Sequence, residues 1–110
     1  ATGAGIVFFL LIHIIDIMLI GLGRDLDDDE ITLLEGWAGE FYGIPVQSTL
    51  DAIGLTGRLE GMIIDTVYEG KSMAGLIAMA RAGEIRPGSR VLYVHLGGAP
   101  ALNAYHSAFA

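Results

Sequence analysis

Two tyrosines, a glutamate and a glycine pair have the types and spacing to do chemistry in this chain. Tyr68 and Glu69 follow a short apolar stretch, Tyr42 precedes a Gly-Ile-Pro turn, and the Gly97-Gly98 pair follows a second apolar stretch. A carboxylate can hydrogen-bond a protonated ring nitrogen, and a phenol whose pKa is lowered can act as a nucleophile or as an acid or base. These residues are therefore compatible with a flat aromatic cofactor that lies over the backbone. The alternative is structural, since such a tyrosine often packs with its hydroxyl in water.

A P-loop has to be considered, because Gly-Lys-Ser at residues 70–72 lies between an apolar stretch and an amphipathic one. That motif requires a glycine at the position of Asp65, and Glu69 would bring a negative charge to the phosphate. The sequence therefore argues against nucleotide hydrolysis.

Metal sites also lack support. Aspartates at alternate positions of the segment 25–29 match the first ligands of a calcium loop, but Glu30 stands where that loop needs glycine and Gly36 where it needs glutamate. The chain has neither a zinc-protease motif nor a serine nucleophile elbow nor a histidine cluster. We expect no metal ligands.

The elements that must position these residues alternate between helices and strands. The apolar spacing predicts helices over residues 46–59 and 72–82, strands over residues 62–68 and 90–96, and a Pro-Gly-Ser turn over residues 87–89. Gly83 is expected to end the second helix, and Pro100 to open a last one. This alternation predicts an α/β fold in which helices flank a parallel sheet, with ligands bound beyond the carboxyl ends of its strands.

The run from Ile6 to Ile20 is apolar except for His13 and Asp16. It is shorter than the ~20 residues that span a bilayer, and an aspartate inside the membrane is costly. It also lacks the basic start and cleavage site of a signal peptide. We interpret it as buried strand, including one over residues 11–17, with a membrane segment as the alternative.

The amino-acid composition argues against particular partners and sites. In 110 residues, 53% are hydrophobic, and 13 acidic against 6 basic side chains give a net charge of −7. Few and scattered basic residues argue against a nucleic-acid partner. The absence of cysteine excludes a disulfide framework and fits a reducing compartment such as the cytoplasm.

Two long motifs resemble a known family. VYEGKSMAGLI at residues 67–77 and GSRVLYVHLGGAPALNAY at residues 88–105 are similar to the C-terminal part of the 1-aminocyclopropane-1-carboxylate (ACC) deaminase/D-cysteine desulfhydrase family. These are pyridoxal phosphate (PLP) enzymes of fold type II, related to the tryptophan synthase β subunit. The likeness extends upstream to about residues 21–25.

The resemblance implies roles for particular residues. Glu69 would contact the pyridine nitrogen of PLP, and Tyr68 and Tyr42 would face the substrate, with Tyr68 the favoured nucleophile or proton handler. Leu96 and Gly97 would lie near the cofactor. Desulfhydrase members resemble HTGG where this chain has HLGG, so Glu69 and Leu96 favour the deaminase branch.

The chain also departs from the family pattern. Thr2 and Gly3 resemble the start of the phosphate-binding loop, but that loop is shortened here. The family's Schiff-base lysine lies upstream of the matching region, and Lys71, the chain's single lysine, is not its counterpart. We expect a structural role for Lys71.

The resulting expectation is that residues 1–110 are the C-terminal part of the PLP-binding large domain of a homo-oligomeric enzyme, without its other domain. The function implied is the opening of the ACC ring to give 2-oxobutanoate and ammonia, although the isolated chain is not expected to turn over substrate. The alternatives are a D-cysteine desulfhydrase and a non-catalytic module that binds PLP or an amino acid.

Overall fold

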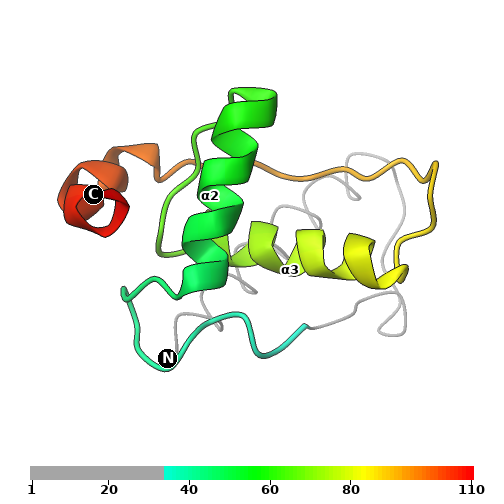
Figure 1. Cartoon of the computed structure of the whole chain (residues 1–110), viewed down its shortest axis with the longest axis horizontal. Coiled ribbons are helices and arrows are strands. Elements are labelled where there is room, and N and C mark those ends of the chain that lie inside the picture. Colours follow the sequence, from blue (N-terminus) through cyan, green and yellow to red (C-terminus); the bar gives the residue numbers. More distant parts are fainter. Residues whose placement is uncertain (1–33) are drawn as a thin grey trace, which may run out of the picture.

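The computed structural model describes residues 34–110, in which two α-helices and a 3-10 helix are joined by irregular segments (Figure 1). In chain order these elements are α2 (Gln47–Glu60), α3 (Glu69–Ala82) and η2 (Ala99–Phe109). Thr2, Gly3, the apolar run at residues 6–20 and the strand predicted at residues 11–17 lie outside the described residues.

Helix α2 confirms the prediction made from the apolar spacing after Pro45 to within one residue. It begins after Val46 and ends at Gly61, which adopts the left-handed conformation with φ of 66° and donates its N–H to the carbonyl of Thr56. Thr49, Ala52, Ile53 and Thr56 recur at helical spacing and form its buried face. The side chain of Thr56 is satisfied within the helix, because its hydroxyl donates to the carbonyl of Ala52 at 2.8 Å.

Helix α3 begins three residues earlier than the apolar pattern predicted. The cause is Asp65, whose carboxylate accepts hydrogen bonds from the N–H groups of Val67, Tyr68 and Glu69 and so satisfies donors that a helix start leaves free. The predicted end at Gly83 is confirmed, with φ of 78°.

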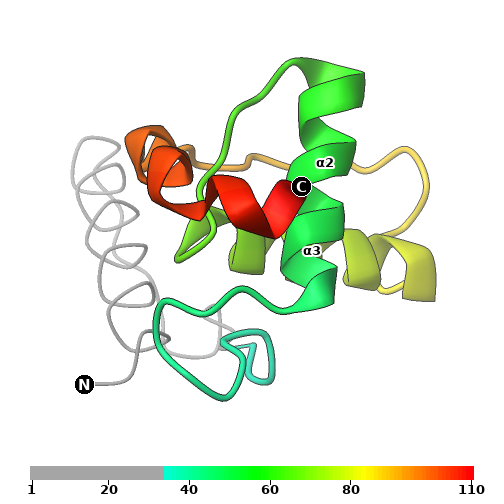
Figure 2. The ribbon, with the colours of Figure 1, turned by 60° about the vertical axis from the view of Figure 1, so that its left-hand side comes forward.

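The core lies where α2 and α3 pack together (Figure 2). Gly70 permits the close approach, because a Cβ there would lie 2.6 Å from the carbonyl oxygen of Asp65 and 2.9 Å from the side chain of Ile53. The buried apolar residues are Ala52, Ile53, Ile64, Met73 and Ala74.

The strands predicted over residues 62–68 and 90–96 are not strands in the part of the chain that the structure describes. A strand needs a partner for its backbone hydrogen bonds, and no ladder joins these two segments or any other described residues. Ile64 is fully buried, but Ile63, Val91 and Leu92 are 54%, 52% and 74% exposed. The prediction of a parallel sheet is therefore not confirmed within residues 34–110.

The Pro-Gly-Ser turn is present, with the N–H of Ser89 donating to the carbonyl of Arg86 at 3.1 Å. The last helix has Pro100 in its first turn as expected, but it is a 3-10 helix with a kink at Tyr105. Within residues 34–110, none of the helices has both the length and the hydropathy that crossing a bilayer requires.

Candidate active site

The start of α3 presents the predicted site residues from a tightly bonded turn. Asp65 is 1% exposed, and its carboxylate lies 2.8, 3.0 and 2.8 Å from the amide nitrogens of Val67, Tyr68 and Glu69. The carbonyl of Asp65 also accepts the N–H of Gly70 at 2.8 Å. The backbone that carries Tyr68 and Glu69 is therefore fixed by a side chain of the turn itself.

Glu69 joins this turn to the loop that ends in the glycine pair. Its oxygen Oε1 accepts the N–H groups of Leu96 and Gly97, the second at 3.0 Å, and lies 2.8 Å from Nδ1 of His95. The side chain is almost fully buried, with 4% of the residue exposed. This carboxylate thus joins the turn at residues 68–69 to the loop at residues 96–98.

The second oxygen of Glu69, Oε2, is buried and has no hydrogen-bond partner among the described residues. A buried carboxylate oxygen normally finds a donor, because leaving it without one is unfavourable. Among the described residues, Oε2 is therefore free to accept a hydrogen bond.

The side chains of Tyr42, which precedes α2 in the sequence, and Tyr68, which follows it, lie next to each other. Their hydroxyls form a hydrogen bond, and their ring centroids lie 6.3 Å apart at an interplanar angle of 63°. The hydrogen bond between Tyr68 and Tyr42 is the main cause that raises the pKa of Tyr68 above 10.0, followed by desolvation. Tyr68 thus lacks the lowered pKa that activates a phenol as a nucleophile.

Lys71 has the structural setting that the sequence predicted. It is 8% exposed, and its ammonium donates to the carbonyl of Ala38. Desolvation lowers the pKa of Lys71, against a smaller opposing effect of Asp65. The contact fastens the segment before Tyr42 to helix α3.

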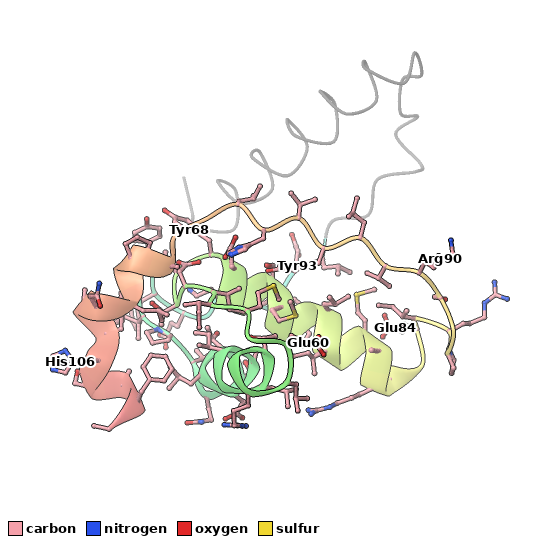
Figure 3. All side chains as sticks on the ribbon, turned by 90° about the horizontal axis from the view of Figure 1, so that it is seen from above. Glu60, Tyr68, Glu84, Arg90, Tyr93 and His106 are labelled. Carbon is pink, nitrogen blue, oxygen red and sulfur yellow. The ribbon has the colours of Figure 1, made fainter. Side chains whose placement is uncertain are left out.

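Three residues that support the site were not identified from the sequence. Asp65 was considered only as a departure from the P-loop motif, although an aspartate four residues before a helix start is a recognisable turn and capping signal. Tyr93 donates to the carbonyl of Glu69 at 2.9 Å and bonds Ser72, so it lies against α3 (Figure 3). His95, which contacts Glu69, could have been identified from its position next to Leu96 in the second motif.

The structure thus brings together Tyr42 with Tyr68, and Glu69 with Leu96 and Gly97. Leu96 contacts Glu69 through its backbone N–H, so its side chain is not what makes this bond. Within residues 34–110 there is no group of three or more potential metal-ligating side chains.

An open hollow lies elsewhere on the described surface, between α2, α3 and the end of η2. Trp37, Arg58, Arg81 and Phe109 are among the residues that line it, and none of the predicted site residues does. The hollow and the candidate site are therefore separate features.

Comparison with known proteins identifies close relatives, although no family model matches the chain. It is 59% identical over 91 residues to an ACC deaminase of Methylobacterium nodulans and 56% identical over 91 residues to one of Burkholderia cenocepacia. An ACC deaminase of Burkholderia multivorans is 55% identical over 92 residues.

These matches cover 83–84% of this chain but 27% of the length of each relative. The resemblance inferred from the two motifs is confirmed, since proteins with this name align with most of the chain. Over that stretch, the chain is homologous to these ACC deaminases.

Proposed function

We propose that this chain contributes the carboxylate and tyrosine side of a PLP-dependent active site that opens the ring of ACC to give 2-oxobutanoate and ammonia. The observation that carries the proposal is that the two carboxylate oxygens of Glu69 differ in their hydrogen bonding. One of its oxygens is held by Leu96 and Gly97, while the other is buried without a partner among the described residues.

The residues present fit the pyridine ring of PLP. Glu69 would hold the ring through Oε2, which can accept a hydrogen bond from a protonated pyridine nitrogen. Once bound, PLP supplies an electron sink for the electrons released when a bond to the substrate's α-carbon breaks. The buried position of Glu69 keeps water from competing for that oxygen.

The tyrosine pair supplies a proton. ACC carries no hydrogen on its α-carbon, so its ring can open by breaking a ring bond to that carbon while a proton leaves the neighbouring methylene to a general base. The methylene released from the α-carbon must then take up a proton to become the methyl group of 2-oxobutanoate. The phenol of Tyr68 is protonated at neutral pH, as its raised pKa requires, and Tyr42 can donate a hydrogen bond to the phenolate that remains after proton transfer. We therefore assign Tyr68 as the acid and Tyr42 as its partner.

The remaining parts of such an enzyme are also proposals. We propose that the segments at residues 62–65 and 90–96 join a parallel sheet of an α/β fold, which would cover the exposed Ile63, Val91 and Leu92. The Schiff-base lysine, the phosphate loop, a homo-oligomeric assembly and a cytoplasmic location are likewise inferred from the family. Lys71 bonds Ala38 and is not offered as the Schiff-base residue.

A chimera tests the proposal. The 91 matched residues of the Methylobacterium nodulans ACC deaminase are replaced by those of this chain, and ammonia and 2-oxobutanoate are measured with ACC as substrate. We expect activity in the chimera and its loss in the Tyr68→Phe variant, with PLP still bound. A folded chimera that binds PLP but releases no ammonia would instead support the non-catalytic alternative, and one that prefers D-cysteine would support the desulfhydrase.

A further inference from the structure

The side chain of Tyr42 is not fixed by burial. Tyr42 is 61% exposed, and its neighbours Phe41 and Ile44 are 58% and 57% exposed. The turn that follows it has one weak internal bond, from the N–H of Ile44 to the carbonyl of Phe41 at 3.4 Å. An exposed ring on such a turn would sample many orientations unless its backbone is held from outside.

Two distant side chains hold this backbone. The hydroxyl of Tyr105 donates to the carbonyl of Gly43 at 2.7 Å, across 62 positions of sequence. On the other side of Tyr42, the ammonium of Lys71 donates to the carbonyl of Ala38. Tyr105 comes from η2 and Lys71 from α3, so the two fastenings reach the turn from different elements.

The contact at Gly43 depends on local geometry. Gly43 has φ of 75°, which favours glycine, and a Cβ at this position would lie 3.4 Å from the hydroxyl of Tyr105. The backbone of η2 departs from helical angles at Tyr105 itself, with φ of −114° and ψ of 16°. The half-buried Tyr105 thus lies against the peptide next to Tyr42.

We propose that Tyr105 is a positioning residue, which holds the turn after Tyr42 so that the hydroxyl of Tyr42 meets that of Tyr68. It acts through the carbonyl of Gly43 and does not touch the reacting atoms. Lys71 holds the segment before Tyr42 through the carbonyl of Ala38. The inference rests on the proposed function, because it assumes that the tyrosine pair donates the proton in that reaction.

Tyrosine titration in the ligand-free 110-residue chain tests the inference without requiring activity, so its outcome is separate from that of the chimera. The chain is prepared with isotope-labelled tyrosine, and the four ring signals are followed by NMR as pH rises, with circular dichroism reporting whether the helices persist. Each signal is assigned from the variant that lacks it.

We expect Tyr105→Phe to lower the titration midpoint of Tyr68 to the value found in Tyr42→Phe, because both variants break the tyrosine pair. Lys71→Met should lower it as well. Tyr93→Phe is the matched control, since it removes a hydroxyl of the same kind that donates to a different carbonyl, and it should leave the pair intact.

A second measurement at neutral pH covers the case of a chain that unfolds when titrated. Contacts between the ring protons of Tyr42 and Tyr68 should give an NMR cross-peak in the native chain, and Tyr105→Phe should abolish it while Tyr93→Phe retains it. A Tyr68 midpoint and a cross-peak that are unchanged in Tyr105→Phe would overturn the inference, as would a native chain in which the two rings show no contact.

Discussion

Asp65 is the residue on which the geometry of the site depends most, and its removal should unfold the start of α3. In Asp65→Ala the N–H groups of Val67, Tyr68 and Glu69 lose the acceptor that now lies 2.8–3.0 Å away. The replacement leaves these donors in a turn where Asp65 is 1% exposed, so water cannot replace the carboxylate without rearrangement.

The expected cost follows from the number and type of these bonds. A hydrogen bond to a charged group contributes about 1.5–3 kcal/mol. Three that share one carboxylate are not additive, and we expect Asp65→Ala to lower the free energy of unfolding by about 3–4 kcal/mol. Asp65→Asn keeps one acceptor oxygen and should cost about half as much.

Urea unfolding followed by circular dichroism measures these differences. Asp51 provides the matched control, because it is an exposed aspartate that accepts one side-chain hydrogen bond, from Gln47 at 2.8 Å. Asp51→Ala should change the free energy of unfolding by less than about 0.5 kcal/mol. A cost of Asp65→Ala no larger than that of Asp51→Ala would show that these three hydrogen bonds do not stabilise the turn.

Three further predictions concern packing, specificity and pH. Gly70→Ala should lower the free energy of unfolding by about 1–3 kcal/mol, because its Cβ would lie 2.6 Å from a backbone oxygen. In the control Gly57→Ala in α2, the nearest atom would lie 4.0 Å from the new Cβ, so the change should be neutral or stabilising. Chemical denaturation compares the two variants. In the ACC-active chimera, Glu69→Ser with Leu96→Thr should shift kcat/KM from ACC toward D-cysteine, and an unchanged ratio would count against the branch assignment. Burial raises the pKa of Tyr93 above 10.0, so stability should fall as pH rises through that raised value, and Tyr93→Phe should lessen the fall in unfolding free energy measured across alkaline pH.

The helices were predictable because their signals are local. Apolar spacing and Pro45 located α2, and Gly83 marked the end of α3. The start of α3 was predicted three residues late because the pattern of apolar residues does not register a capping side chain in the preceding turn, where Asp65 does the capping. The 3-10 form of η2 likewise has no signature in apolar spacing.

The predicted strands show the opposite situation. Segments 62–68 and 90–96 have the composition of buried strands, but a strand forms only where another strand can pair with it. Ile64 is buried against the helices, whereas Val91 and Leu92 lie exposed. The sequence pattern thus records a preference for burial that residues 34–110 alone do not satisfy.

For the site, the residue types were predictable and the connections between them were not. Tyr68, Glu69 and Tyr42 stand at conspicuous turns, but nothing in their spacing indicates that the two hydroxyls meet. The raised pKa of Tyr68 follows from that contact, so it too could not be predicted from the spacing. The hydrogen bond from Tyr105 spans 62 positions and is visible only in three dimensions.

The state of the pyridine nitrogen tests the central claim most directly. PLP labelled with an NMR-active isotope at its ring nitrogen is bound to the chimera, and the chemical shift of that nitrogen is recorded for the chimera itself, for its Glu69→Gln variant and for the control Glu84→Gln, which changes an exposed glutamate. We expect a protonated nitrogen in the chimera and in Glu84→Gln, and an unprotonated one in Glu69→Gln. The same chemical shift in all three proteins, or a folded chimera that does not bind PLP, would contradict the proposed role of Glu69.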